Sequence, residues 1–175
     1  MIIGIGGSSN SGKSHLAQSI IENLKDIDAV HLCQDDYVKY SGYLTKYRGH
    51  IDWELPATIK FDEYFQAVLK AENENDIVIA EGLFAFYFEE LYNLYSFKIF
   101  MTLSREIFFS RKRNDDRWGI EPYWYIEHIW NSHQKYGKGM LKQPYLLVDA
   151  GKEINITGIC KKISDLYYSE KKDRL

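Results

Sequence analysis

The chain has 175 residues, 45% of them hydrophobic, and a net charge of −3. This length suits a single domain over residues 1–175 with an ordinary buried core. The slightly acidic balance argues against nucleic-acid binding, which usually requires a basic face. No apolar run approaches the roughly 20 residues of a membrane span. No signal peptide opens the chain either, so we expect a cytoplasmic protein without a membrane partner.

Cysteine and histidine give no sign of a structural metal or of a disulfide framework. Cys33 and Cys160 form no Cys-x-x-Cys pair, and the five histidines lack metal-ligand spacing. We therefore expect neither a zinc site nor a disulfide, and each cysteine is expected to be a small buried apolar residue.

Apolar runs alternate with helical patterns along the chain. The expected strands cover residues 2–6, 29–33, 77–80, 97–101 and 145–148. The expected helices cover residues 13–25, 59–72, 104 to about 114, 122–136 and 157–169. Strands that alternate with helices predict parallel βαβ units, so the expected fold class is α/β, with a three-layer, doubly wound sheet. Ligands of such sheets bind beyond the carboxyl ends of the strands.

The first expected strand leads into Gly-Ser-Ser-Asn-Ser-Gly-Lys-Ser, the pattern of a phosphate-binding P-loop. Glycines allow a tight turn whose N–H groups, with the following helix N-terminus, form a cradle for polyanions. In this interpretation Lys13 reaches the β- and γ-phosphates and the Ser14 hydroxyl ligates Mg²⁺. The alternative is a glycine-rich turn with an exposed lysine. The residues expected around the phosphates are Gly7, Ser8, Ser9, Asn10, Ser11, Gly12, Lys13 and Ser14.

Acidic residues follow the second and third expected strands. The second is followed by Gln34-Asp35-Asp36-Tyr37, and Glu81 ends the third. A carboxylate at such a position can accept the proton of an attacking hydroxyl or hold Mg²⁺. The structural alternative is a turn or a cap, which acids also favour. Beside a P-loop we favour a functional role for Glu81 and for at least one of the two aspartates.

Two further segments have the composition of substrate-binding elements. The loop from about 35 to 55 is rich in aromatic rings, and loops of this length are commonly functional. Tyr37 and Trp53 there either stack on a planar base or pack the loop onto the domain. Asp52 is expected to accept hydrogen bonds from sugar hydroxyls. A cationic segment at about 111–122 is either a lid over a phosphoryl group or a solvated helix end. Its candidate residues are Arg111, Arg113, Arg117 and Trp118, the last as one face of a base sandwich.

The ordered set of motifs resembles the nicotinamide riboside kinases, within the uridine kinase group of P-loop nucleoside kinases. The resemblance covers residues 2 to about 151. One departure concerns the ring that can precede the ribose-binding aspartate in nicotinamide riboside kinases, because here Ile51 precedes Asp52 and Trp53 follows it. The motifs are Gly-Gly-Ser-Ser-Asn-Ser-Gly-Lys-Ser, Gln34-Asp35-Asp36-Tyr37, Ile51-Asp52-Trp53, Ile79-Ala80-Glu81-Gly82 and the arginine lid.

The resemblance implies a five-stranded parallel P-loop kinase core with an arginine lid, and ATP and Mg²⁺ as cofactors. It implies phosphorylation of the 5′-hydroxyl of a small-molecule nucleoside, either nicotinamide riboside or uridine and cytidine. Asp35 would be the catalytic base, Asp52 would bind ribose and Glu81 would lie near Mg²⁺. Lys13 and Arg113 would complete the catalytic set, and the nucleotide would also contact Arg111 and Arg117. Tyr37, Trp53 and Trp118 would line the acceptor site.

Other functions stay open at this point. A P-loop kinase for another small alcohol, such as pantothenate, would share the P-loop, base and lid. A nucleotide-dependent switch would share the P-loop alone, although the Asn-Lys-x-Asp element of guanine-specific switches is missing from the sequence. The sequence also leaves open a homo-oligomer.

Overall fold

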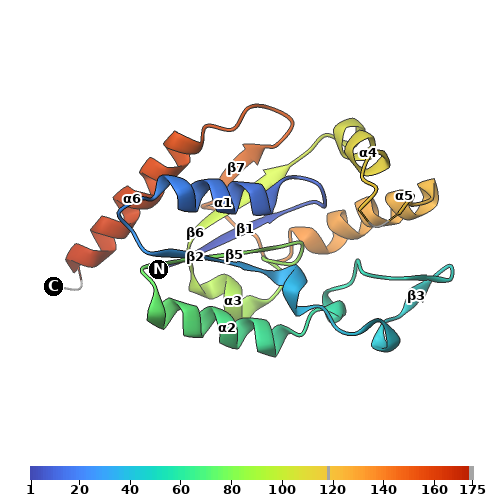
Figure 1. Ribbon diagram of the computed structural model, residues 1–175, viewed down its shortest axis with the longest axis horizontal. Helices are drawn as coiled ribbons and strands as arrows, with labels where there is room; N and C mark the ends of the chain where they lie inside the picture. The colour runs from blue at the N-terminus through green and yellow to red at the C-terminus, as the bar shows by residue number, and fades with distance from the viewer. Residues whose placement is uncertain (118, 174–175) are drawn as a thin grey trace.

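Five parallel strands form one sheet in the order β2-β5-β1-β6-β7, as the computed structural model shows for residues 1–117 and 119–173 (Figure 1). The five expected strands are confirmed, and their ends differ by at most two residues from the expected ones. The strands are β1 (Ile2–Gly7), β2 (Ala29–Cys33), β5 (Ile77–Gly82), β6 (Tyr95–Thr102) and β7 (Leu146–Asp149).

Helices cover both faces of the sheet, which confirms the three-layer α/β class. On one face lie α1 (Lys13–Asn23) and α6 (Ile156–Asp173), and on the other lie α2 (Phe61–Glu74) and α3 (Glu89–Leu94) (Figure 1). Two clusters of buried apolar residues correspond to the two faces. No helix within the described ranges combines the length and the apolar character needed to cross a membrane.

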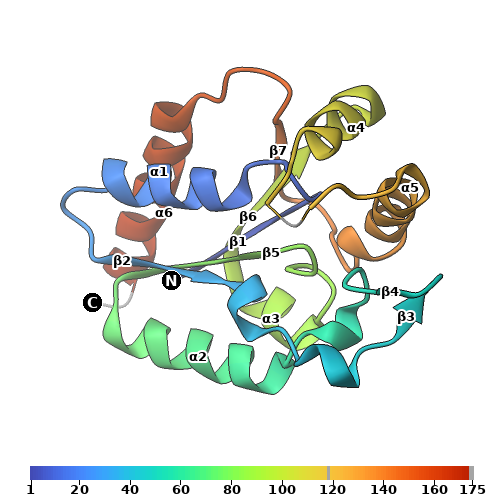
Figure 2. The ribbon, with the colours of Figure 1, turned by 45° about the vertical axis from the view of Figure 1, so that its right-hand side comes forward.

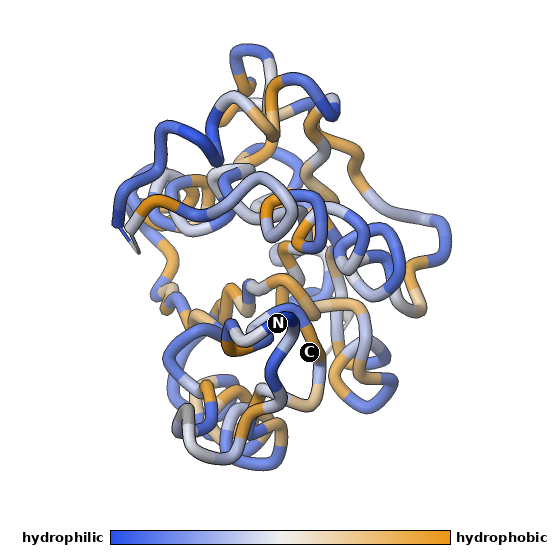
Figure 3. The backbone as a smooth tube through the Cα atoms, turned by 90° about the vertical axis from the view of Figure 1, so that its right-hand side faces the viewer, coloured by the Kyte–Doolittle hydropathy of each residue, from blue (hydrophilic) through white to orange (hydrophobic). Residues whose placement is uncertain are grey.

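Two glycines in β1 let large aromatic rings pack directly on the strand. A β-carbon added at Gly4 would lie 2.7 Å from the ring of Tyr95, and one added at Gly6 would lie 2.5 Å from the ring of Phe86. Glycine within a strand commonly marks such a close approach. The inner strands β1 and β5 are buried throughout, as expected, whereas the edge strand β2 is only half-buried. Figure 3 shows hydrophobic segments alternating with hydrophilic ones along the backbone.

The register of the sheet places the candidate site at the carboxyl ends of the strands. Glu81 in β5 pairs with Ile5 of β1 on one side and with Cys33 of β2 on the other. The P-loop and the 3₁₀ turn Gln34–Tyr37 therefore begin beside Glu81. At the same end of the molecule lie α4 (Arg105–Arg113) and α5 (Tyr123–Ser132), with both chain termini toward the opposite end (Figures 1 and 2).

The loop at 35–55 carries more structure than expected. It contains a second short turn, Ser41–Tyr43, and a hairpin of β3 (Lys46–Tyr47) and β4 (His50–Ile51). Arg48 and Gly49 between these strands both have positive φ, at 49° and 87°. Positive φ at both central residues is the requirement of a type I′ turn. Two helical features differ from the expected ones: α3 was not predicted, and α5 ends earlier than expected because a π-helical turn, His133–Gly137, follows it.

Candidate functional site

The P-loop folds as a tight turn that leads directly into α1. Ser11 N–H donates to Ser8 O at 3.2 Å, and Leu16 N–H donates to Gly12 O at 2.9 Å in the first turn of the helix. Gly12, at the N-cap position, has φ 85°, a conformation that glycine adopts without steric cost. Asn10 has φ 57° in the same turn. The N-terminal end of α1 consequently meets the loop, as a phosphate-binding cradle requires.

Two serine hydroxyls of the loop are buried without a partner. Ser8 and Ser11 are only 1% and 2% exposed, and their Oγ atoms have no hydrogen-bond partner within the described residues. Lys13 Nζ donates to Ser8 O at 3.2 Å, which places its ammonium group over the turn. Buried hydroxyls without partners are costly, whereas phosphate oxygens would accept their hydrogen bonds. The loop therefore fits a bound polyphosphate.

The carboxylate of Glu81 contacts two side chains beside the P-loop. Its Oε1 accepts a hydrogen bond from Ser14 Oγ at 2.6 Å and lies 3.3 Å from His31 Nε2. Burial raises the pKa of Glu81, but the hydrogen bond from His31, the charge of Lys13 and the hydrogen bond from Ser14 outweigh burial and lower it to about 2. Glu81 is therefore ionised at neutral pH.

The Ser14 and Glu81 oxygens suit Mg²⁺, which prefers hard oxygen ligands. Within the described part of the chain, no group of three or more acidic, histidine or cysteine residues is arranged to hold a metal ion. Mg²⁺ sites of phosphoryl-transfer enzymes usually take one or two protein ligands, supplemented by substrate phosphates and water.

Asp35 follows β2, and β5 lies between β2 and the strand β1 that leads into the P-loop. It belongs to the turn Gln34–Tyr37 and remains accessible to solvent, while nearby protein atoms remove part of its hydration. This partial burial raises the pKa of Asp35, the charge of Lys13 opposes the rise, and Glu81 adds to it. The charges of Lys13 and Glu81 therefore both act on the Asp35 carboxyl group, whose role as a base stays a prediction.

Two lid arginines connect to the P-loop. Arg111 donates to Asn10 O at 3.1 Å and to Ala150 O at 2.8 Å, so it bridges the loop and the segment after β7. Arg117 makes two 2.7 Å hydrogen bonds to Asp115, whose Oδ2 accepts a 2.9 Å bond from Asn10 Nδ2. The segment 111–117 is therefore held against the P-loop at two points.

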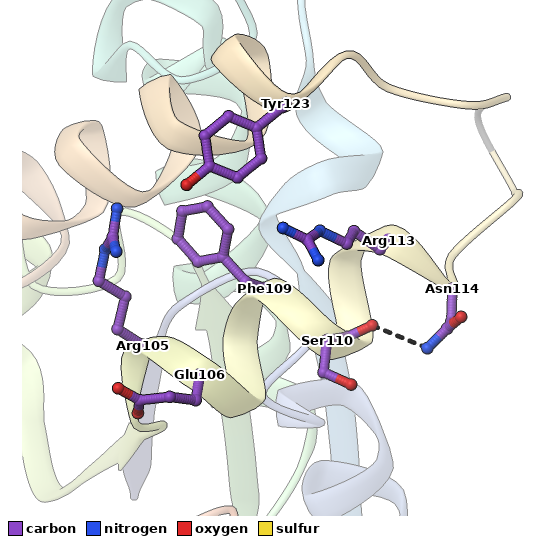
Figure 4. Close-up of a pocket in the computed structure, with 7 residues that line it drawn as sticks. All are labelled: Arg105, Glu106, Phe109, Ser110, Arg113, Asn114 and Tyr123. Carbon is purple, nitrogen blue, oxygen red and sulfur yellow. Dashed lines mark hydrogen bonds between the residues drawn. The ribbon is translucent and has the colours of Figure 1, made fainter.

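Arg113 takes a different direction from α4. Its guanidinium carbon lies 5.4 Å from the centroid of the Tyr123 ring, and it lines a surface hollow of about 490 Å³ with Phe109 (Figure 4). Within the described residues this contact is with Tyr123 and not with the P-loop. Trp118, expected to face a base, lies outside the described residues.

Helix α5 holds the 35–55 loop in place. The ring of Tyr47 stacks on His128 with centroids 4.0 Å apart, and Tyr125 Oη donates to Ile51 O at 2.8 Å. His128 Nε2 also donates to Asp52 Oδ1 at 2.9 Å. Asp52 is buried, with 6% exposure, and is fixed by α5 rather than extended into solvent.

The two aromatic candidates of the loop differ. Tyr37 packs against the buried Tyr64 with centroids 5.1 Å apart, so its ring belongs partly to the core. Trp53 is 41% exposed and remains available for contact with a ligand. Of the two interpretations of these rings, packing describes Tyr37, and base stacking stays a prediction for Trp53.

Four polar residues around this site were not predicted from the sequence: His31, Glu54, Lys112 and Glu121. Glu54 is 8% exposed, and Lys112, 6% exposed, lies 3.0 Å from Glu121 in an ion pair. The sequence offers two signals: His31 interrupts an otherwise apolar strand, and Glu54 follows Asp52 by two residues in the 35–55 loop. The Lys112–Glu121 pair joins α4 to the segment before α5, and no local sequence pattern indicates this ion pair.

Comparisons with known proteins agree with the fold and the motifs. A model of the phosphoribulokinase / uridine kinase family matches residues 61–118. Nicotinamide riboside kinase 2 from Mus musculus is 24% identical over 160 residues, which cover 80% of this chain and 81% of that protein. A uridine kinase from Chlamydia pneumoniae is 31% identical over 127 residues, which cover 58% of this chain and 57% of that protein.

The solved structures support the same fold. The structure of shikimate kinase from Bacteroides thetaiotaomicron superposes with a TM-score of 0.61 at 19% identity, over 95% of this chain and 97% of that one. At this identity the likeness concerns the fold alone, which is the α/β fold of P-loop kinases.

The titration of Glu54 gives a prediction about stability. Burial, the largest cause, raises the pKa of Glu54 from 4.5 to about 7. Between these values the unfolded chain loses a proton that the folded chain keeps, so the free energy of unfolding falls as the pH rises. We expect the free energy of unfolding of Glu54→Gln to rise relative to that of the wild type by up to about 3 kcal/mol between pH 4.5 and 7. At higher pH the difference should not increase further.

Urea unfolding across this pH range, followed by circular dichroism, measures the difference. Glu63→Gln is the matched control, since Glu63 is 62% exposed and its replacement should change the free energy of unfolding little. A Glu54→Gln difference that stays constant with pH would contradict the elevated pKa of Glu54.

Proposed function

We propose that this chain, which belongs to the phosphoribulokinase and uridine kinase family, transfers the terminal phosphoryl group of ATP to the primary hydroxyl of a nucleoside. The matched relatives are themselves kinases, which supports a phosphotransferase. The observation that carries the proposal is the convergence of Asp35, Lys13 and Glu81 at one edge of the sheet, beside a P-loop with unpaired buried hydroxyls.

The donor side of the site is built for a triphosphate. Ser8 and Ser11 would donate to phosphate oxygens, and Lys13 would bind the terminal phosphates. Ser14 and Glu81 would hold Mg²⁺ together with phosphate oxygens. When bound, that ion neutralises negative charge on the phosphates.

The acceptor side places a base opposite those phosphates. Asp35 would accept the proton of the attacking primary hydroxyl, and its raised pKa makes it a stronger base than an ordinary aspartate. Lys13 and the lid arginines Arg111 and Arg117 would stabilise charge on the transferring group. We keep Arg113 as a weaker candidate, because reaching the phosphates would require it to leave Tyr123.

The acceptor-binding loop supports a sugar-bearing substrate. Asp52 is fixed by His128, and within the described residues its side chain makes both of its hydrogen bonds through Oδ1, so Oδ2 can accept from a sugar hydroxyl. Trp53 offers an exposed ring to a base. Because the relatives include nicotinamide riboside kinases and uridine kinases, we propose nicotinamide riboside, uridine and cytidine as the acceptors to test.

An ATP-consumption screen tests the proposal. We expect ADP release to depend on Mg²⁺ and to rise well above background only when one of the three nucleosides is present. Pantothenate serves as the comparison acceptor. Release that is slow and independent of every acceptor would instead indicate a nucleotide-dependent switch, and release with pantothenate alone would indicate a different small-alcohol kinase.

The role of Asp35 gives the second prediction. Asp35→Asn removes the base but keeps the size of the side chain, so we expect kcat to fall by roughly a hundredfold or more. The affinity for ATP, measured by isothermal titration calorimetry, should change little. The adjacent Asp36→Asn is the matched comparison and should keep most of its turnover. Equal turnover in Asp35→Asn and wild type would remove Asp35 from the role of base.

A further inference from the structure

His31 is a polar residue on the side of the edge strand β2 that faces α1. In the pairing of β2 with β5, His31 lies beside Ile79, and Cys33 lies beside Glu81. Alternate residues of a strand share a face, so His31 and Glu81 project to the same side of the sheet. This is the side of α1, because Ile79 belongs to the same buried cluster as Leu16 of that helix. The imidazole therefore lies in the layer between the sheet and α1.

The ring reaches the carboxylate of Glu81 in this layer. Nε2 of His31 is 3.3 Å from Oε1 of Glu81, and the same oxygen accepts the 2.6 Å hydrogen bond from Ser14 Oγ. An ionised carboxylate can only accept, so His31 Nε2 carries a proton and donates it. The side chain of Glu81 is 1% exposed and that of His31 is 21% exposed. One buried oxygen is thus held by a donor from β2 and a donor from α1.

The two donors together set the orientation of the carboxylate. With Ser14 as its only donor, the Glu81 carboxylate could rotate and present either oxygen to the serine. The second hydrogen bond, from another element, opposes this rotation and so fixes the direction of both oxygens. The Ser14 hydroxyl keeps its lone pairs for a cation while its proton points to Glu81. The His31 bond therefore acts on the oxygens that suit Mg²⁺.

We propose that His31 is a positioning residue of the metal site, which holds the Glu81 carboxylate in the orientation that binds the Mg²⁺ of Mg²⁺–ATP together with Ser14. This inference rests on the proposed function for its nucleotide and its metal, and it assigns a role to a residue that touches neither. Hydrogen-bond partners of metal ligands orient those ligands, and replacing such a partner typically lowers metal affinity by about 10- to 100-fold. Because the bond is long, we expect an effect near the lower end of this range.

Binding of the nucleotide without the metal should not depend on His31. The groups proposed to meet the phosphates directly are the loop N–H groups, the hydroxyls of Ser8 and Ser11, and the Lys13 ammonium group. Within the described ranges of the chain, the His31 side chain hydrogen-bonds to Glu81 and to none of these groups. A defect at His31 should therefore appear only in the metal-dependent part of the nucleotide affinity.

The test uses Mn²⁺, a paramagnetic substitute for Mg²⁺, with the non-hydrolysable analogue β,γ-imido-ATP. Electron paramagnetic resonance measures the Kd of Mn²⁺ for the complex of protein and analogue. His31→Phe keeps a ring and removes the donor, so this Kd should rise about tenfold. His31→Gln carries an N–H donor at similar reach and should recover most of the affinity. Calorimetry in EDTA should give the same Kd for the metal-free analogue in the wild type and both variants.

Val30→Ala is the matched control. Val30 precedes His31 in β2 but packs against the buried cluster on the opposite face of the sheet. Its truncation perturbs the same strand without removing a donor to Glu81, so the Mn²⁺ affinity should stay unchanged. Circular dichroism confirms that each variant is folded. His31→Val, whose β-branched side chain suits a strand, takes the place of His31→Phe if that variant does not fold.

Unchanged Mn²⁺ affinity in folded His31→Phe overturns this inference and leaves the kinase proposal intact. Equal losses in His31→Phe and His31→Gln overturn it as well, because the hydrogen bond would then not be the cause. A wild type that binds Mn²⁺ with the analogue but phosphorylates no acceptor overturns the kinase proposal alone. A wild type that binds no Mn²⁺ with the analogue overturns both.

Discussion

The hydrogen bond from Ser14 Oγ to Glu81 Oε1, at 2.6 Å, joins the first turn of α1 to the end of β5. It depends on the parallel register, which sets Glu81 between Ile5 and Cys33. A buried acid at this position would ordinarily hold its proton. Hydrogen bonds and the nearby lysine keep Glu81 ionised instead, and the carboxylate can then contribute to cation binding beside the P-loop.

A second set of contacts connects the lid to the acceptor loop. The Lys112–Glu121 ion pair fixes the segment that leads into α5. From α5, His128 holds Asp52 and Tyr125 holds Ile51. Helix α5 therefore lies between these two elements, because its Tyr123 contacts Arg113 of α4 and its His128 contacts Asp52.

The sequence predicted the sheet and the P-loop because both depend on local patterns, namely apolar runs and glycine spacing. It left the loop rings open, since whether Tyr37 packs on Tyr64 depends on a helix distant in sequence. Arg113 illustrates the same limit, because spacing alone gives no direction to a side chain on α4. The burial of Glu54 could not be predicted in the same way, because its local sequence shows only that it lies near Asp52, and burial is a property of the folded molecule.

A crystal structure of the protein with Mg²⁺ and a non-hydrolysable ATP analogue tests the central claim most directly. The account predicts the triphosphate within the turn from Gly7 to Ser14, the metal beside Ser14 and Glu81, and the terminal phosphate facing Asp35. A triphosphate bound away from that turn, or an Asp35 carboxyl directed away from the terminal phosphate, would contradict it.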